Sequence, residues 1–192
     1  SCDVQPNGDG TYAVTFVPEK RGEVIVEVSM DGEPIKDMPV TVPVSILADP
    51  DASFAEGAGL ERDIVGQEAS FVISAVANDG ELTTASEVTA AIVDDAGSEV
   101  PCDVQPNGDG TYNVTFVPEK RGDVIVEASV DGQPIRDMPV TVPVDILSDP
   151  SQSYAEGPGL EHGTVSHDAT FTVFAVAADG ELTTASEVTV AI

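Results

Sequence analysis

The sequence predicts an all-β protein made of antiparallel β-sandwiches, and three observations support this fold class. Valine, threonine, glycine and proline are abundant in the 192 residues, and β-branched side chains suit a pleated sheet whereas Gly and Pro mark turns. Apolar and polar residues alternate in short runs between Gly-, Pro- and Asp-rich segments, which is the pattern of half-buried strands. The heptapeptide PNGDGTY occurs at residues 6–12 and again at residues 106–112, which indicates a repeat.

The repeat unit is about 100 residues long. Residues 1–50 are identical to residues 101–150 at 41 positions, and residues 51–92 are identical to residues 151–192 at 26 of 42 positions. This length fits a seven-stranded sandwich better than a helical-hairpin repeat.

Seven strands, lettered A to G, are expected in the uninterrupted unit. Segment A covers residues 53–65, and the other six are runs of period 2 at residues 68–79, 86–93, 99–105, 111–118, 123–130 and 138–144. Gly108 and Gly110 tolerate the positive φ that the tight D–E connection requires. The order of strands predicts a sandwich of the immunoglobulin type. The side chains expected in its core are Ala69, Phe71, Ile73, Ala75, Ala77, Val88, Ala90, Ile92, Val100, Cys102, Val104, Tyr112, Val114, Phe116, Val124, Val126, Ala128, Val130, Val140, Val142 and Val144.

These residues resemble the immunoglobulin-like repeat of the filamins (actin-binding protein 280). The resemblance rests on ASFVISAVANDG at residues 69–80 and on VPCDVQPNGDGTYNVTFVPEKRGDVIVEASVDGQPIRDMPVTVPV at residues 100–144. AEGAGL at residues 55–60 resembles the Gly-rich segment that opens the family's repeat. The family usually has a small residue, Pro and Phe before the last strand, where this sequence has Met138, Pro139 and Val140. Actin cross-linking is not implied, because the sequence contains no actin-binding helical domain.

The heptapeptide joins strands D and E, and this sets the phase of the repeat. We expect residues 1–46 to be the D–G half of one repeat, residues 51–146 to be a complete repeat, and residues 151–192 to be the A–C half of the next. The chain is then cut within a domain at both ends. A half sandwich leaves an apolar sheet face bare, so complementary halves of neighbouring copies are expected to meet head to tail. Such a contact is heterologous and does not close, and it generates an open filament.

Two functions are compatible with the sequence. The first is structural, a segment of a tandem-repeat rod or filament whose partners are copies of itself. The second is implied by the resemblance, because filamin-type repeats accept partner peptides as an added strand in the groove between strands C and D. Transferred to this chain, the resemblance implies a groove formed by Thr89, Ala91 and Val93 of strand C and by Pro101 and Asp103 of strand D.

Catalysis, cofactors and structural metals are not expected. The sequence has no GxSxG nucleophile elbow, and its GxG motifs lack the strand–helix context that phosphate binding requires. The NGDG turn does not match a calcium-binding EF-hand loop, because acids are missing at the required spacing. His162 and His167 correspond to Arg62 and Gln67 in the other copy, so we interpret them as surface residues rather than metal ligands.

Charge excludes one class of partner. The chain carries 35 acidic residues against seven Lys and Arg, a net charge of −28, and this field repels nucleic-acid backbones. The acids either keep a Thr- and Val-rich surface soluble or adapt the chain to salty, cation-rich surroundings. No apolar run reaches the ~18–20 residues of a membrane helix, so no membrane span is expected.

The cysteines and one glycosylation sequon indicate in which cellular compartment the protein is expected. Cys2 and Cys102 are equivalent, so neither can form a disulfide within its own domain, and Cys102 is expected to be a buried reduced thiol. Asn113 opens a glycosylation sequon and is expected to point outward. The unpaired cysteine and the resemblance favour the cytoplasm. The acidity, the scarcity of lysine and the sequon favour a cell-surface or extracellular fibre, which is our preferred interpretation.

Overall fold

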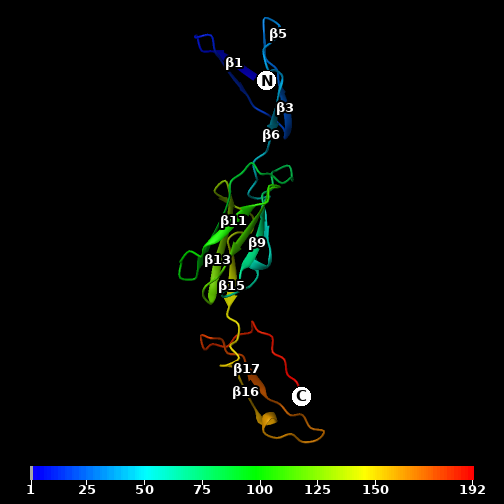
Figure 1. Ribbon diagram of the computed structural model, residues 1–192, viewed down its shortest axis with the longest axis vertical. Coiled ribbons are helices and arrows are strands. Elements are labelled where there is room, and N and C mark those ends of the chain that lie inside the picture. The colour runs from blue at the N-terminus through cyan, green and yellow to red at the C-terminus, as the bar shows by residue number, and fades with distance from the viewer. Residues whose placement is uncertain (1) are drawn as a thin grey trace.

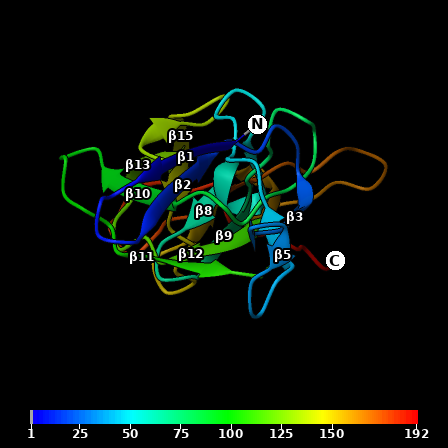
Figure 2. The same cartoon turned by 90° about the horizontal axis from the view of Figure 1, so that it is seen from above.

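The chain folds as an elongated rod of three parts strung end to end (Figure 1). The computed structural model describes residues 2–192, so that Ser1 lies outside the described residues. A complete sandwich occupies the middle, residues 2–46 extend from one end of it, and residues 151–192 extend from the other. Seen from above, along the rod, the three parts lie behind one another (Figure 2). The first and third parts are therefore at opposite ends of the molecule.

The central part consists of two packed sheets. The first sheet has the strand order β11-β12-β9-β7. The second has the order β10-β13-β15-β8, with β14 paired to β13 and with β8 parallel to β15. The bounds are β7 (Phe54–Glu56), β8 (Asp63–Ile64), β9 (Ala69–Ser74), β10 (Val88–Asp94), β11 (Cys102–Pro106), β12 (Thr111–Phe116), β13 (Gly122–Val130), β14 (Gln133–Pro134) and β15 (Val140–Asp145). The predicted all-β, antiparallel fold class is confirmed.

The core lies between these sheets and contains the side chains that the alternation selects. Phe71, Ile73, Ile92 and Val114 are at most 2 % exposed. Burying an aliphatic or aromatic side chain of this size contributes about 1.5–3 kcal/mol. Residues near the ends of the alternating runs or on the edge strands are only partly buried against this core: Val88, Ala90, Cys102, Val104, Tyr112 and Val140.

The Gly-rich segment after β7 allows two stretches of backbone to touch. It contains a 3₁₀ turn, η1 (Ala58–Leu60), which packs against β9. A Cβ on Gly57 would lie 2.7 Å from Phe71 Cα, and a Cβ on Gly59 would lie 2.8 Å from Ser70 N. Gly57 also has a φ of 145°, which side chains rarely tolerate. The AEGxGL pattern is thus explained by close packing of backbone on backbone.

Residues 2–46 form hairpins whose pairing matches that of the central part. β1 (Cys2–Pro6) pairs with β2 (Tyr12–Phe16) in the register of β11 with β12. β3 (Gly22–Val26) pairs with β6 (Val40–Val44) in the register of β13 with β15. β4 (Ser29–Met30) and β5 (Glu33–Pro34) form a third short pair. Each of these sheets has two strands, and apolar side chains on them, such as Val14 and Phe16, are exposed.

Residues 151–192 have less regular structure than their central counterparts. β16 (Tyr154–Glu156) pairs with β17 (Thr172–Phe174), and η2 (Pro158–Leu160) corresponds to η1. β17 has three residues where β9 has six, and residues 187–192, which correspond to the start of β10, do not form a strand. In the central part β9 pairs with β12 and β10 pairs with β13. Without strands of that type beside it, the third part has fewer inter-strand hydrogen bonds to hold it in extended form.

Candidate functional site

The hairpins of residues 2–46 enclose an open apolar cleft of about 1270 Å³. Val14 is 50 % exposed and Phe16 is 40 % exposed in this cleft. An exposed apolar surface of this kind marks a binding surface on a protein in water. The apolar residues that line it include Val4, Val14, Phe16, Val24, Val26 and Met30.

The central sandwich shows what covers the same surface. Val114 and Phe116, the counterparts of the two residues above, are only 0 % and 3 % exposed. On β12, Val114 lies opposite Phe71 and Phe116 lies opposite Ala69 of β9. In the other sheet, β10 lies along β13. In the central sandwich, β9 and β10 thus lie beside the strands that correspond to β2 and β3.

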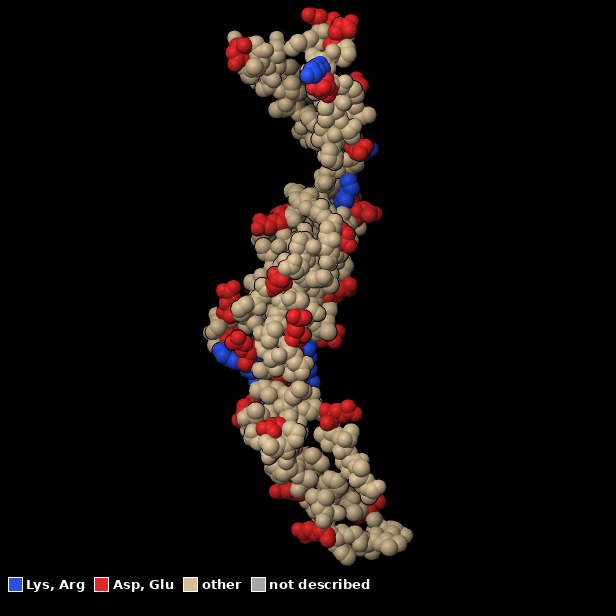
Figure 3. Space-filling view, in the orientation of Figure 1, with Lys and Arg blue, Asp and Glu red and all other residues tan. Residues whose placement is uncertain are grey.

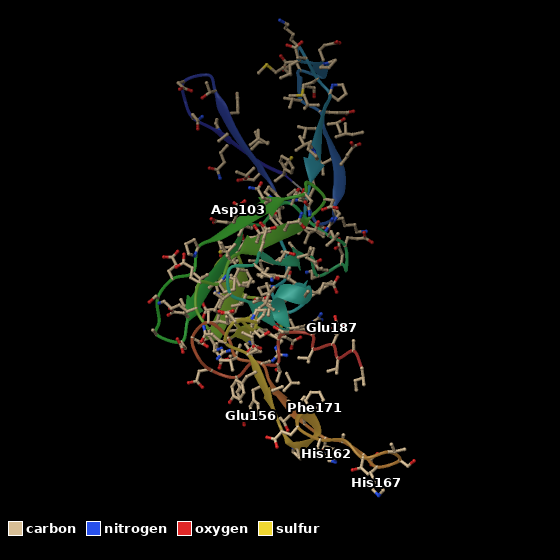
Figure 4. The ribbon with its side chains drawn as sticks, turned by 60° about the horizontal axis from the view of Figure 1, so that its bottom comes forward. Asp103, Glu156, His162, His167, Phe171 and Glu187 are labelled. Atoms are coloured by element: carbon tan, nitrogen blue, oxygen red, sulfur yellow. The ribbon has the colours of Figure 1, made fainter. Side chains whose placement is uncertain are left out.

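Residues 151–192 also expose an apolar face. Val173 is 39 % exposed, whereas its counterpart Ile73 is fully buried. Val188 and Val190 are 52 % and 57 % exposed. Figure 4 shows Phe171, the counterpart of a core phenylalanine, in this part of the chain. This face and the cleft lie at opposite ends of the rod, so they do not cover each other (Figure 1).

The residues predicted for the groove between strands C and D lie on the edges of the two sheets. Thr89, Ala91 and Val93 are on β10, which is the edge of one sheet. Asp103 is on β11, the edge of the other sheet, and Pro101 directly precedes β11 (Figure 4). The two edges run next to each other, since Cys102 Sγ of β11 lies 3.6 Å from Ala90 O of β10.

These residues have different surroundings. Thr89 and Ala91 line a hollow of about 420 Å³ that also involves Ser129, Pro134 and Met138. The hydroxyl oxygens of Thr89 and Ser129 are 2.7 Å apart. Asp103, in contrast, is exposed and accepts a hydrogen bond of 2.7 Å from Gln105 Nε2. The hollow thus belongs to the β10–β13 sheet and not to β11.

The outer edge of β10 is partly closed by the loop that leads to β11. Val100 N donates to Ile92 O at 2.8 Å, and Val93 forms a bridge with Glu99. Val93 is therefore engaged in pairing within the chain. A strand added from outside would have to displace this loop or use only the first half of β10.

Cys102 faces the core but is less buried than the sequence predicts, because β11 is an edge strand. Its Sγ lies 3.6 Å from Ala90 O. Burial, with smaller contributions from the Glu99 and Asp103 carboxylates, raises the pKa of the Cys102 thiol. Cys2 is exposed, and both cysteines are free.

The remaining predicted positions are on the surface. Asn113 is exposed on β12, and its Nδ2 donates to Asn107 Oδ1 at 3.1 Å. His162 and His167 are exposed at the far end of the third part (Figure 4). Among residues 2–192, no group of three or more His, Cys, Asp or Glu side chains is placed to hold a metal ion. None of the helices in the described chain has the length and apolar character of a membrane span.

The role of the arginines at the junctions between the parts was not predicted from the sequence. Arg21 and Arg121, each in a PEKRG turn, form ion pairs with Asp79 and Asp179 of the following part. Figure 3 shows most of the few basic side chains near the two narrow junctions of a largely acidic rod. The sequence does contain a signal that could have indicated this role, because Arg recurs in this turn although the chain has only seven Lys and Arg residues.

Comparisons with known proteins agree with this architecture. The family model of the Filamin/ABP280 repeat matches residues 1–41, 47–141 and 147–192. Filamin-C of Mus musculus is 34 % identical over 173 residues, which are 89 % of this chain and only 6 % of the length of Filamin-C. The Escherichia coli adhesin FdeC matches with a TM-score of 0.60 at 20 % identity, over 94 % of this chain and 59 % of that chain. Invasin, a bacterial integrin-binding protein, matches with a TM-score of 0.54 at 14 % identity, over 97 % of this chain and 41 % of that chain.

The two bacterial structures share the fold alone, since their sequences are far apart from this one. The three stretches matched by the family model follow the three parts of the rod. Together with the similarity to Filamin-C they confirm the resemblance read from the sequence, and the chain belongs to the Filamin/ABP280 repeat family.

Proposed function

We propose that this chain is a segment of a structural rod, in which repeats join head to tail by completing each other's sandwiches. Filamin repeats are non-enzymatic structural modules. One observation carries the proposal: the exposed faces of residues 2–46 and 151–192 are of the two types that cover each other in the central sandwich. The complement comes from the neighbouring repeat of a longer polypeptide or from a second copy of the chain.

The position of the two faces supports an open assembly. They lie at opposite ends of the rod, so each chain offers one face of each type to different neighbours (Figure 1). A contact between unlike faces that does not close into a ring adds one copy after another along a line. The product is a filament with a repeated sandwich at every joint.

Two variants that each block one end test the proposal. Val14→Asp places a charge in the cleft of residues 2–46, and Phe171→Asp places one on the face of residues 151–192. Sedimentation velocity of the unmodified chain is expected to show species whose mass grows with concentration. Each variant alone is expected to stay monomeric. An equimolar mixture is expected to form a dimer and nothing larger, because the intact face of the Val14→Asp chain binds the intact cleft of the Phe171→Asp chain. The two remaining ends of that dimer are both blocked.

His167→Asp is the matched control, because His167 is exposed and its counterpart Gln67 is also exposed in the central sandwich. This variant is expected to assemble like the unmodified chain. An unmodified chain that stays monomeric at all concentrations, or a mixture that grows beyond dimers, contradicts the proposal.

Binding of partner peptides by strand addition at β10 is a second candidate function. The hollow beside Thr89 and Ala91 favours it, because pockets next to a sheet edge give selectivity to an added strand. Selection of random decapeptides on the immobilised chain provides the probe. The enriched peptides should lose binding to Ala91→Lys and retain binding to Thr141→Lys, an exposed position on β15. Peptides that bind both variants equally would place the site elsewhere.

Asn113 is a proposed glycosylation site in a secreted form of the protein. Its exposed side chain on β12 supports this proposal. Expression through a eukaryotic secretory pathway should add glycan mass to the chain, and Asn113→Gln should remove it. A secreted chain of unmodified mass would count against the site.

A further inference from the structure

The first junction contains an arginine that is held at three points by the next part of the rod. Arg21 Nε lies 2.9 Å from Asp79 Oδ2, and Arg21 Nη2 donates to Asp79 Oδ1 at 3.1 Å. Arg21 Nη1 donates to Leu82 O at 2.8 Å. The two side chains are 30 % and 32 % exposed, so the pair is partly withdrawn from water. A planar guanidinium bound to both oxygens of a carboxylate fixes orientation as well as distance.

The second junction pairs the same two residue types one hundred residues later, through one nitrogen of the guanidinium. Arg121 Nη1 lies 3.1 Å from Asp179 Oδ2, with side-chain exposures of 24 % and 32 %. Arg62 adds a second bridge there, since its Nη2 lies 2.6 Å from Asp145 Oδ2 and donates to Thr184 Oγ1 at 3.3 Å. The same pair of residue types therefore joins both pairs of neighbouring parts.

The connecting segments are bound as well. In the first junction, Thr83 Oγ1 donates to Ile46 O at 2.7 Å and Ala48 N donates to Ser86 Oγ at 2.7 Å. Thr83 and Ser86 are 4 % and 7 % exposed. The second junction has equivalent bonds, from Ser148 N to Ser186 Oγ at 2.7 Å and from Asp149 N to Val176 O at 2.7 Å. Segments bound in this way do not behave as flexible linkers.

Charge gives the arginines a physical reason to be at these places. With a net charge of −28, neighbouring parts of the rod repel each other. Four of the seven basic residues are arginines, and Arg21, Arg62 and Arg121 all form contacts at a junction. A partly buried ion pair is screened less by salt than an exposed one. The few cations thus offset repulsion where acidic parts come closest (Figure 3).

We infer that Arg21 and Arg121 are orientation clamps, each of which holds one repeat at a defined angle to the next through the loop that contains Asp79 or Asp179. Neighbouring repeats then keep a fixed orientation, and the chain is a stiff rod. The inference concerns contacts within a single chain, so it does not depend on head-to-tail assembly.

The angle at the first junction is measured by electron–electron resonance between two spin labels. The labels are placed through Glu33→Cys and Asn107→Cys, two exposed sites on either side of the junction, in a Cys2→Ala and Cys102→Ala background. A narrow distance distribution is expected, and Arg21→Gln should broaden it at least twofold. Lys36→Gln is the matched control, since Lys36 is 91 % exposed and pairs with neighbouring Asp37 at 3.9 Å.

Hydrogen exchange tests both junctions in the same chain. Arg21→Gln should accelerate exchange of the Ala48 and Asp49 amides about tenfold and leave Ser148 and Asp149 unchanged, and Arg121→Gln should do the reverse. Arg121→Asp combined with Asp179→Arg should restore protection at the second junction. A broad distance distribution in the unmodified chain overturns the inference. Equal effects of Lys36→Gln and Arg21→Gln also overturn it, because they would show a general effect of net charge.

Discussion

Val14 and Val114 occupy the same position of the same hairpin, yet Val14 is 50 % exposed and Val114 is fully buried. The two hairpins have the same register, Val4 with Val14 and Val104 with Val114. The difference comes from β9, which lies along β12 and has no counterpart beside β2. The same local sequence therefore contributes a hairpin in one place and a sandwich core in another.

Val114→Ala is expected to destabilise the central sandwich by about 2 kcal/mol, because it leaves a cavity in a packed core. Val14→Ala should leave the unfolding midpoint of the central sandwich unchanged, since Val14 is outside that core. Urea denaturation of both variants at a concentration where the chain is monomeric measures the difference. Equal midpoints for the two variants would show that Val114 is not packed as described.

Gly59→Ala is expected to destabilise the central sandwich by about 1–3 kcal/mol, because its Cβ would meet the backbone of Ser70. Gly163→Ala is the control, since nothing lies within 4 Å of a Cβ there. That variant should change stability by less than about 0.5 kcal/mol. Thermal unfolding followed by circular dichroism distinguishes the two outcomes.

Asp63 is expected to make the central sandwich less stable as the pH rises. Asp63 is 6 % exposed, and burial raises the pKa of its carboxyl to about 6. The pKa of an unfolded chain is ~3.9, so between these values the folded state keeps a proton that the unfolded state releases. The contribution of Asp63 to stability therefore falls between about pH 4 and pH 6.

Asp63→Asn removes this titration and serves as the comparison. The free energy of unfolding of the variant minus that of the unmodified chain should be larger at about pH 7.5 than at about pH 4. A difference that does not depend on pH would mean that the Asp63 carboxyl has an ordinary pKa in the folded chain.

Cys2 is expected to react with a thiol reagent before Cys102 does. Cys102 is half-buried and its thiol has a raised pKa, so less of the reactive thiolate is present. Mass spectrometry of the labelled peptides over time gives both rates in one sample. In urea the two rates should converge, and equal rates in the folded chain would contradict the position of Cys102.

Ser86→Ala is expected to loosen the first connecting segment, because the Ala48 N–H loses its acceptor. An unpaired buried donor costs about 1–3 kcal/mol. Thr84→Ala is the control, since Thr84 is exposed in the same loop. Exchange of the Ala48 amide should accelerate only in the first variant.

Short-range patterns in the sequence predicted strands B to G, whereas the expected segment A at residues 53–65 is divided by η1 into β7 and β8, which belong to different sheets. Phe71, Ile73, Val114 and Val126 were assigned to the core from alternation alone, because a two-residue period places them on one face whatever their partners are. The pairing of β10 with β13 and of β12 with β9 also follows the expected order of a sandwich. The closure of the β10 edge by Val100 was not predictable from periodicity, because it depends on the path of a loop.

Other features depend on contacts between distant residues. Arg21 and Asp79 are 58 residues apart, and Arg21 lies in a turn whereas Asp79 is the last residue of an alternating run. Asp63 is buried although carboxylates usually stay in water, because its short strand is held beside Val144 of β15. The shortening of β17 relative to β9 reflects missing partner strands and not a difference in pattern alone.

The repetition of the junction bonds has a geometric consequence. Asp49 N bonds Val76 O in the first junction as Asp149 N bonds Val176 O in the second, and this shared anchoring favours a similar rotation and advance at each step along the rod. Objects related by one repeated step trace a screw. A feature found once per repeat, such as the hollow beside Thr89, would then recur along a spiral with a set pitch. A bivalent ligand would therefore bind most tightly when the spacing of its two binding groups matches the spacing of this feature along the rod.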